Sequence, residues 1–228
     1  MRIIFVRHGH PDYKTDSLTE LGHRQAEAAA HQLAWRGISE IYSSSCGRAV
    51  QTAEHTAALL GLPVTQLDFM REVKWGKDGQ TPGEHEKYHP WNCAYALAAS
   101  GADMVRYDYD SLPTYHDTRF EECFHFVSRS FDEWLAGFGY ERDGLIYRCT
   151  RENDRTIALF SHGGASSCVF AHLLNLPPMY LCACFPIGFT SFTVFDFRGE
   201  AGGPAVPVLS VFNEHAHIED GCPNHYEM

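Results

Sequence analysis

The sequence predicts an α/β fold, a three-layer α/β/α sandwich with a mainly parallel sheet. Residues 3–6 and 156–160 are short apolar runs rich in β-formers, which is typical of buried strands. Strand-like segments at 38–43 and 63–67 alternate with two helical segments, and this spacing predicts parallel strands with right-handed crossovers. With 228 residues and 44% hydrophobic content the chain can bury one substantial core, so we expect a single domain over 1–228.

The first expected helix has end signals in the sequence. Thr19 is expected to cap a helix over 19–36, and Gly37 stops it. Ser17 and Glu20 form a competing capping box, so the start of this helix is open by one turn.

The rest of the chain continues the same pattern. The other expected elements are a helix at 47–60 ended by Gly61, an amphipathic helix at 120–135, a charged loop at 148–155, a helix from Gly164 to about 174, and strands at 189–197 and 206–212. Pro204 and Pro207 place the last strand at a sheet edge, because proline cannot donate a hydrogen bond to a neighbouring strand.

Residues 74–118 depart from this rhythm. They are rich in Gly, Pro, Tyr, His and Trp, with one helix expected near 91–99. An aromatic, polar insertion after a core strand is a candidate lid or substrate wall, so we expect a cap-like insertion over the sheet edge. Its aromatic side chains fit a lid or a core equally well, and they are Trp75, Tyr88, Trp91 and Tyr95.

Composition narrows the classes of partner. The formal net charge of −11, without a basic run, argues against nucleic acid but not against an anionic substrate bound by local arginines. No apolar stretch approaches membrane-spanning length, and no signal peptide is evident, so we expect a cytoplasmic protein without a membrane partner. The eight scattered cysteines are typical of reduced, mostly buried thiols, and we expect Cys182-x-Cys184 in the core.

Two of the expected strands end in the same way. Arg7-His8-Gly9 follows the first, and Ser161-His162-Gly163 follows the later one. Ligands of open α/β sheets bind outside the carboxyl ends of the strands. Glycine lets backbone N–H groups approach a ligand, and Arg48 in the first turn of a helix is unfavourable unless an anion binds there. Guanidinium groups suit phosphate oxygens, and a neutral, oriented imidazole can act as a nucleophile.

These motifs resemble the histidine phosphatase superfamily, also called the phosphoglycerate mutase-like family. The resemblance covers most of the chain and leaves the 74–118 insertion unmatched. The matching motifs are Arg7-His8-Gly9, Leu18-Thr19-Glu20-Leu21-Gly22 with Gln25-Ala26, Ser43-Ser44 with Arg48-Ala49 and Gln51-Thr52-Ala53, Ser161-His162-Gly163-Gly164, and the closing segment from Asn213 to Ile218.

The resemblance implies a role for each matched residue. His8 is the nucleophile that becomes phosphohistidine, and Arg7, Arg48 and His162 line the phosphate pocket. Gly163 is expected to bind substrate through its backbone. Guanidinium and imidazolium groups can supply the positive charge that phosphoryl transfer requires, so we expect no metal and no cofactor.

The resemblance also implies a general acid after the third strand. The match there is Arg71-Glu72, so Glu72 is expected to protonate the leaving oxygen and later to activate water. Its pKa would have to be raised by burial or by a neighbouring carboxylate. Three acids in the insertion are alternatives, namely Asp78, Glu84 and Glu86.

The chain departs from the family pattern at two positions near the nucleophile. His10 stands where relatives often carry Glu, and Lys14 stands where they often carry a phosphate-binding Asn. We expect His10 to contact substrate or to support His8, and Lys14 to bind phosphate in place of the Asn. His215-x-His217 could present two imidazoles to a metal, but no carboxylate or thiolate stands at a suitable spacing.

We expect hydrolysis of a small phosphomonoester through phospho-His8, with a phosphorylated metabolite as partner; a homodimer is compatible with the sequence. A mutase that returns phosphate to a bound phosphoglycerate is one alternative, although the insertion does not resemble the long central segment of the mutases. A catalytically idle phosphate-binding protein is another. A thiol phosphatase would need Cys46, which lacks the Gly-rich turn and the downstream arginine of such sites.

Overall fold

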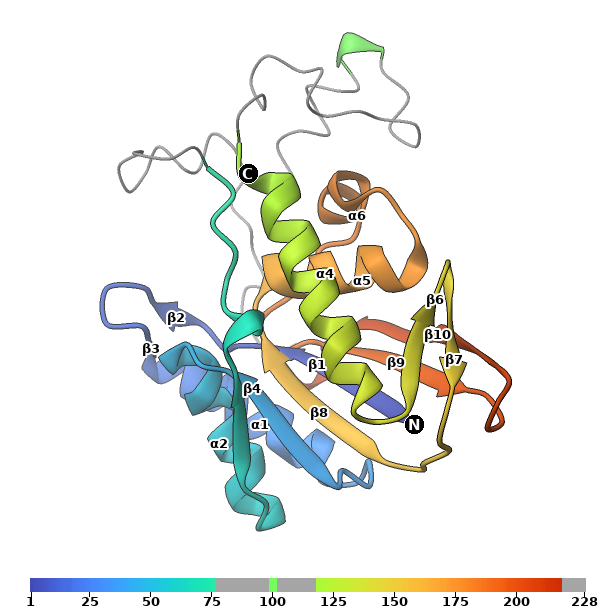
Figure 1. Ribbon diagram of the computed structural model, residues 1–228. Helices are drawn as coiled ribbons and strands as arrows, with labels where there is room; N and C mark the ends of the chain where they lie inside the picture. Colours follow the sequence, from blue (N-terminus) through green and yellow to red (C-terminus); the bar gives the residue numbers. More distant parts are fainter. Residues whose placement is uncertain (77–98, 102–117, 219–228) are drawn as a thin grey trace.

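The computed structural model describes residues 1–76, 99–101 and 118–218, and it confirms the α/β class. An eight-stranded sheet lies between two layers of helices, with the strands in the order β5-β4-β8-β1-β9-β10-β7-β6 (Figure 1). The strands are β1 (Arg2–Arg7), β4 (Glu40–Ser44), β5 (Val64–Leu67), β6 (Tyr140–Asp143), β7 (Ile146–Cys149), β8 (Thr156–Ser161), β9 (Phe192–Arg198) and β10 (Pro204–Glu214). A separate small pair consists of β2 (Pro11–Asp12) and β3 (Ser17–Leu18).

The sheet is mixed, and its parallel part is the part that the sequence predicts. β5, β4, β8 and β1 pair in parallel along the order of the sheet. β9, β10, β7 and β6 then follow in antiparallel pairs. The four parallel strands therefore end together at one edge, where ligands of such sheets bind.

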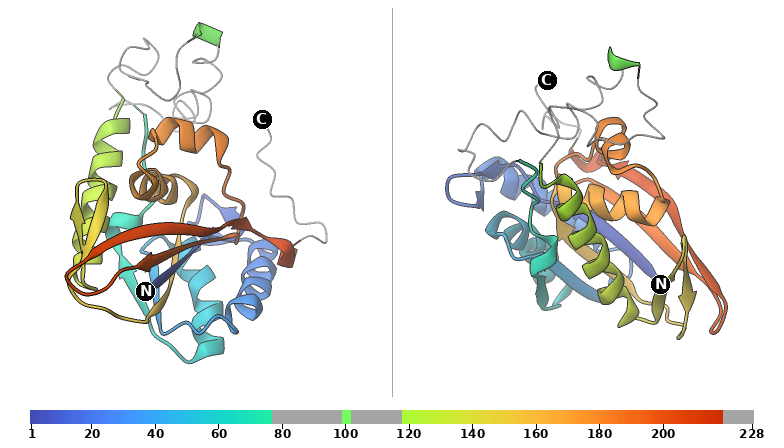
Figure 2. Two further views of the ribbon diagram at one scale, coloured as in Figure 1. Left: turned by 90° about the vertical axis from the view of Figure 1, so that its right-hand side faces the viewer. Right: turned by 45° about the horizontal axis from the view of Figure 1, so that its top comes forward.

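The helices cover both faces of the sheet (Figure 2). They are α1 (Glu20–Leu33), α2 (Gly47–Leu60), α4 (Phe120–Ala136), α5 (Gly163–Leu174) and α6 (Pro178–Cys184). Alternate residues of β1 serve the two faces, as the strand period of two requires. Ile3 and Phe5 belong to the core shared with α4 and α5, whereas Ile4 and Val6 belong to the core shared with α1 and α2.

The helix ends that depend on local chemistry are predicted well. Thr19 caps α1, and its hydroxyl accepts from the Gly22 amide at 3.1 Å, so the capping box at Ser17 is not used. The α1 helix ends at Leu33, three residues before the expected Arg36, because the Arg36 amide turns back to the Leu33 carbonyl in a tighter i→i−3 bond.

The end of α2 also follows the sequence. Gly61 takes a left-handed conformation with φ of 67°, where glycine carries no steric penalty.

The prediction of a charged loop at 148–155 is partly wrong. Arg148 and Cys149 belong to β7, which forms a hairpin with β6. The Asp143–Gly144 pair marks this hairpin in the sequence, and the turn itself consists of Gly144 and Leu145, with Gly144 at a φ of 62°. The helix α6 was also absent from the expected elements.

Two strand expectations near the end of the chain are corrected. The strand predicted at 189–197 begins only at Phe192, and residues 187–191 form a loop at the sheet edge instead. β10 lies between β9 and β7 in the sheet and is not its outermost strand. β7 pairs only with Pro204 and Ala205 of β10, however. From Val206 onward, the hydrogen-bonded neighbour of β10 is β9.

The two ends of the predicted insertion lie side by side. The Arg119 amide donates to the carbonyls of Trp75 and Gly76 at 3.2 and 3.1 Å, and the Trp75 ring stacks on Phe120 with centroids 4.8 Å apart. Trp75 is buried and is therefore a core residue. Of the predicted insertion the structure describes only residues 74–76, 99–101 and 118, and residues 99 and 100 are helical. The cap-like role, the rest of the helix near 91–99 and the aromatic residues Tyr88, Trp91 and Tyr95 fall outside the described residues and stay predictions.

The described cysteines are all free thiols, and four of the six are buried. Cys182 lies in the core as expected, whereas Cys184 is exposed, so only one half of the Cys182-x-Cys184 pair packs inside. In the part of the chain that the structure describes, no helix has both the length and the apolar character needed to cross a membrane.

Replacing Phe5 tests the core between β1 and the helices α4 and α5. Phe5 is 2% exposed and contacts the rings of Phe131, Phe170 and Phe195. Phe5→Ala should lower the free energy of unfolding by about 3–5 kcal/mol, because it leaves a cavity among these rings. Urea denaturation measures the change.

The matched control is Phe126→Ala on α4, where the ring is 54% exposed. It should change the free energy of unfolding by about 0.5 kcal/mol or less. Equal losses in the two variants would contradict the assignment of Phe5 to the core.

Candidate active site

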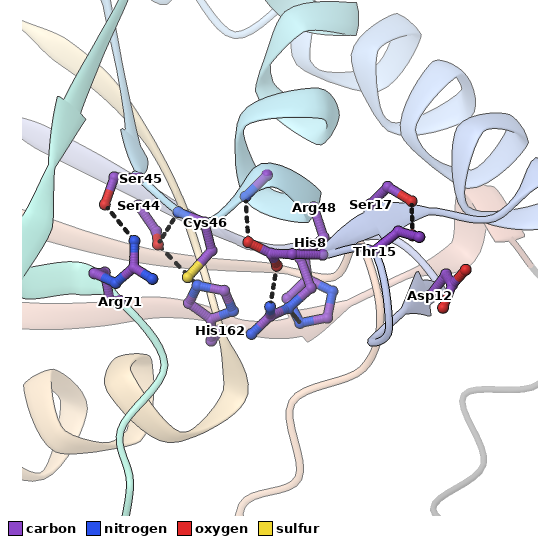
Figure 3. A network of polar contacts seen from close by, with 12 residues as sticks. His8, Asp12, Thr15, Ser17, Ser44, Ser45, Cys46, Arg48, Arg71 and His162 are labelled. Atoms are coloured by element: carbon purple, nitrogen blue, oxygen red, sulfur yellow. Dashed lines mark hydrogen bonds and ion pairs between the residues drawn. The ribbon is translucent and has the colours of Figure 1, made fainter.

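The carboxyl ends of β1 and β8 bring two histidines together. The strands pair in parallel with Arg7 opposite Ser161, so His8 and His162 leave the sheet at the same edge. Their ring centroids are 5.0 Å apart. Arg48 reaches the same place from the first turn of α2, and its Nε donates to Nε2 of His8 at 3.3 Å. Figure 3 shows these three side chains next to one another.

His8 is held as a single tautomer. Its Nδ1 lies 2.7 Å from the carbonyl oxygen of Gly9, and a carbonyl only accepts, so Nδ1 carries the proton. Nε2 therefore presents a lone pair. Burial lowers the pKa of His8 well below its usual value, and the charges of His162, Arg7 and Arg48 lower it further. The ring is neutral near pH 7, as a nucleophilic imidazole must be.

His162 presents a donor at the same place. Its Nε2 lies 2.8 Å from Oγ of Ser44, which also accepts from the Cys46 amide at 3.2 Å. A Ser44 hydroxyl that accepts there can donate its proton to Nε2, which leaves the proton of His162 on Nδ1. This Nδ1 is buried and has no hydrogen-bond partner among the described residues. Burial, and then the charge of Arg48, lowers the pKa of His162 well below its usual value.

Arg7 is oriented by the loop at 187–191. Its Nη1 donates to the Ile187 carbonyl at 2.6 Å, and its guanidinium carbon lies 4.1 Å from the centroid of the Phe189 ring. That distance is typical of a cation–π contact. The Phe189 ring is also 5.7 Å from the rings of both His8 and His10. The loop at 187–191, which takes the place of the first residues of the predicted strand, thus forms one wall of the site.

The closing segment at 213–218 supports that loop. Oδ1 of Asn213 accepts from the Gly188 amide at 2.7 Å, and Nε2 of His217 lies 3.2 Å from Oγ1 of Thr190. The Thr190 amide donates to the Arg7 carbonyl at 3.0 Å. Thr190 and Asn213 both have positive φ, near 50°. The closing segment at 213–218 therefore supports the loop that carries Phe189.

The histidine pair weighed as metal ligands is engaged with protein groups. Nδ1 of His215 donates to the Asn213 carbonyl at 2.6 Å, and the ring of His217 stacks on Phe192 with centroids 4.7 Å apart.

Asp16 is a site residue that the sequence did not indicate. Its Oδ1 accepts from Nη1 of Arg48, and its Oδ2 accepts from the Gly47 amide at 2.8 Å. The sequence predicts only a polar loop there, and no local pattern shows that the loop folds back onto α2. The available signal is indirect: Cys46, which is a poor capping residue, stands at the N-cap of α2, two residues before Arg48.

Glu72 lies at the N-terminus of α5. Its Oε1 accepts from the Ala165 and Val73 amides at 3.1 Å each, and its Oε2 accepts from the Gly164 amide at 3.5 Å. Burial raises the pKa of Glu72, against the lowering by the charge of Arg7 and by these backbone bonds. Gly164 and Ala165 follow His162 by two and three residues, so these bonds place Glu72 at the same sheet edge as His162.

Two glycines make close approaches possible around the site. A Cβ at Gly164 would lie 2.7 Å from Oε1 of Glu72 and 2.6 Å from Cγ2 of Val73. A Cβ at Gly22 would lie 2.2 Å from the His10 carbonyl oxygen. Real Cβ atoms do not approach so closely, so only glycine allows α5 and α1 to reach these neighbours.

Three further residues were predicted to bind substrate, and they lie in different elements. Nδ1 of His10 lies 2.9 Å from Oγ1 of Thr19, and Gly163 is the buried first residue of α5. Lys14 is exposed in the turn between β2 and β3. Their contacts with substrate stay predictions. The alternative acids lie outside the described residues, and they are Asp78, Glu84 and Glu86.

A neutral imidazole lone pair, two oriented guanidiniums and a partly buried carboxyl group lie at one edge of this α/β sheet, and their charge and geometry suit a phosphoryl group. Comparison with known proteins agrees. A model of the histidine phosphatase superfamily (branch 1) matches residues 3–106. A glucosyl-3-phosphoglycerate phosphatase of Mycobacterium tuberculosis is 30% identical over 231 residues, which cover 95% of this chain and 96% of that protein.

Two further relatives carry different names. A probable phosphoglycerate mutase of Yersinia pestis is 34% identical over 192 residues, covering 78% of this chain and 76% of that protein. The structure of a phosphoserine phosphatase mutant from Entamoeba histolytica, in complex with phosphoserine, is similar with a TM-score of 0.63 and 25% identity, covering 95% of this chain and 98% of that one. The chain belongs to the histidine phosphatase superfamily.

The two buried imidazoles predict how stability depends on pH. The folded-state pKa values of His8 and His162 lie below the ordinary value of 6.5, so below that pH the unfolded chain binds more protons than the folded one. The free energy of unfolding should therefore fall as pH is lowered from about 6.5, and each ring contributes up to about 1.4 kcal/mol per pH unit.

Urea denaturation from about pH 5 to 7.5 measures this slope. His162→Gln removes one of the two rings and should reduce the slope by about one proton. His31→Gln, at an exposed site of α1, controls for the loss of a histidine as such. A slope that His162→Gln leaves intact would contradict the assignment.

Proposed function

We propose that this protein hydrolyses a small phosphomonoester by way of a phosphohistidine at His8. The observation that carries the proposal is the tautomer of His8, because its Nδ1–H is bound to Gly9 and its Nε2 lone pair lies beside Arg48. An in-line attack on phosphorus needs such a lone pair with positive donors around the phosphoryl oxygens.

In the first step, Nε2 of His8 attacks phosphorus and the bond from phosphorus to the ester oxygen breaks. Arg7 and Arg48 offer charged donors to the equatorial oxygens, and Nδ1–H of His162 offers a third. Nδ1 of His162 supports this role because it has no hydrogen-bond partner within the described part of the chain; a buried donor without an acceptor is costly, and a phosphoryl oxygen would satisfy it.

The leaving oxygen takes its proton from Glu72. Burial raises the pKa of that carboxyl group and so favours the protonated form that an acid requires. In the second step the Glu72 carboxylate takes a proton from water, whose oxygen attacks phosphorus. The P–N bond then breaks, and phosphate and free His8 result.

Relatives support a small phosphorylated metabolite as substrate, since their names include phosphatases of glucosyl-3-phosphoglycerate and of phosphoserine. Which such compound this protein takes depends on groups beyond the phosphate. The free thiols of the described cysteines support a reducing compartment, and we place the protein in the cytoplasm.

Phosphoglycerate mutase activity is the second candidate, favoured by the relative from Yersinia pestis. A mutase must keep its phosphoenzyme from water, whereas a phosphatase admits water to it. Isomerisation of phosphoglycerate that 2,3-bisphosphoglycerate stimulates would favour the mutase. Release of inorganic phosphate without isomerisation would favour the phosphatase.

Trapping the phosphoenzyme tests the nucleophile. Protein quenched during turnover of p-nitrophenyl phosphate should carry an acid-labile, alkali-stable phosphoryl group on His8. His8→Ala should lose both the label and turnover, while Arg24→Ala on the exposed face of α1 should keep both. A label that persists in His8→Ala, or phosphate binding without any turnover over a broad panel, would overturn the proposal.

Glu72→Gln tests the general acid through the leaving group. Because p-nitrophenolate leaves without a proton, its hydrolysis should fall about 10-fold or less, whereas hydrolysis of an alkyl phosphate should fall about 100-fold or more. Steady-state kcat/KM values for both substrates provide the comparison. An equal loss for both would assign Glu72 a structural role at the N-terminus of α5 instead.

A further inference from the structure

We propose that Asp16 is a positioning residue, which orients Arg48 for phosphate from a segment of the chain outside the matched motifs. The proposal rests on the function proposed above and adds a residue to it. The juxtaposition that carries it is one carboxylate that accepts both from the Arg48 guanidinium and from the first amide of the α2 helix.

The contact replaces a helix cap that α2 lacks. Cys46 at the N-cap makes no side-chain capping bond, and no acidic residue occupies the first turn. A carboxylate at a helix N-terminus is favourable, whereas the Arg48 cation there is not. Asp16 therefore offsets the unfavourable place of Arg48 while it binds the Gly47 amide.

The same contact limits the directions in which Arg48 can point. Nη1 is bound to Asp16, Nε to Nε2 of His8, and the Tyr13 ring lies 5.5 Å from the guanidinium carbon. Among described residues these contacts use Nε and one hydrogen of Nη1, so Nη2 and the second hydrogen of Nη1 remain for a phosphoryl oxygen, and Nε is released when the Nε2 lone pair of His8 attacks phosphorus. An arginine fixed before substrate arrives loses less side-chain entropy on binding phosphate.

The backbone around Asp16 is built for this contact. Asp16 has a φ of 52°, a conformation that aspartate and asparagine tolerate better than most residues. A Cβ at Gly47 would lie 2.3 Å from the Asp16 carbonyl oxygen, so only glycine lets the segment lie this close to α2. Two positions far apart in the sequence are thus fitted to one interaction.

A competing role for Asp16 predicts the opposite effect on phosphate binding. If Asp16 merely occupied donors that phosphate would use, then removal of its charge would strengthen phosphate binding. If Asp16 orients Arg48, removal of the charge should weaken phosphate binding. Asp16→Asn separates the two, because asparagine keeps the backbone conformation and an acceptor for the Gly47 amide but loses the negative charge.

We expect Asp16→Asn to raise KM and the inhibition constant of inorganic phosphate about 10- to 100-fold, as the loss of a bond to a charged group implies. The melting temperature should fall by only about 2–4 °C, because asparagine keeps the bond to the Gly47 amide and loses only the charge that faces Arg48. Asp12→Asn on the same hairpin is the matched control, since the Asp12 carboxylate accepts from the Lys14 amide and contacts neither Arg48 nor α2 among the described hydrogen bonds. It should leave KM and phosphate binding unchanged.

A double-mutant cycle with Arg48→Ala shows whether Asp16 acts through Arg48. In the Arg48→Ala background, Asp16→Asn should cause little further loss in kcat/KM or in phosphate binding. Additive losses, or tighter phosphate binding in Asp16→Asn, would overturn the proposal, as would a loss of activity explained by unfolding alone.

Calorimetric titration with inorganic phosphate and with orthovanadate gives a readout that needs no turnover. If the unaltered protein releases no phosphate from any substrate, the proposed function fails, yet the effect of Asp16→Asn on phosphate binding still decides the role of Asp16. The two failures are therefore distinguishable.

Discussion

β1 and β8 pair in parallel with Arg7 opposite Ser161, so the residues that follow the two strands leave the sheet at the same edge and in the same direction. This register sets the distance between His8 and His162, whose ring centroids lie 5.0 Å apart. A slip by one residue would turn every side chain of β1 to the opposite face of the sheet. The buried residues that flank the site hold the register, because Phe5 belongs to one core and Val6 to the other.

Positive charge gathers at this edge, and two carboxylates from outside the neighbouring helices balance it. Asp16 accepts from the first amide of α2 and from Arg48, and Glu72 accepts from amides in the first turn of α5. Each helix that points its N-terminus at the site thus receives a carboxylate from a distant segment. Burial raises the pKa of Glu72, which suits this carboxyl group to hold a proton.

Features that depend on neighbouring residues were predictable from the sequence. The Thr19 hydroxyl caps α1 by accepting from the amide of Gly22, three residues further along, and Gly61 ends α2 in a left-handed conformation. The buried runs of β1 and β8 stand out because both faces are covered. The hairpin around Gly144 had a local Asp-Gly signal and could have been predicted with the rest. The wall at Phe189 could not, because its alternation continues the pattern of β9 and only the contacts with Arg7 and Asn213 show a loop there.

The sequence by itself determined the order of the parallel strands and of the helices between them, the grouping of His8, Arg7, Arg48 and His162 as candidate site residues, and the family, since these depend on motifs of a few adjacent residues. Only the tertiary structure decided which nitrogen of His8 carries the proton, and that Asp16 lies against Arg48. Hydrogen bonds between segments depend on how the chain folds back in space, and side-chain spacing along the sequence does not encode that path.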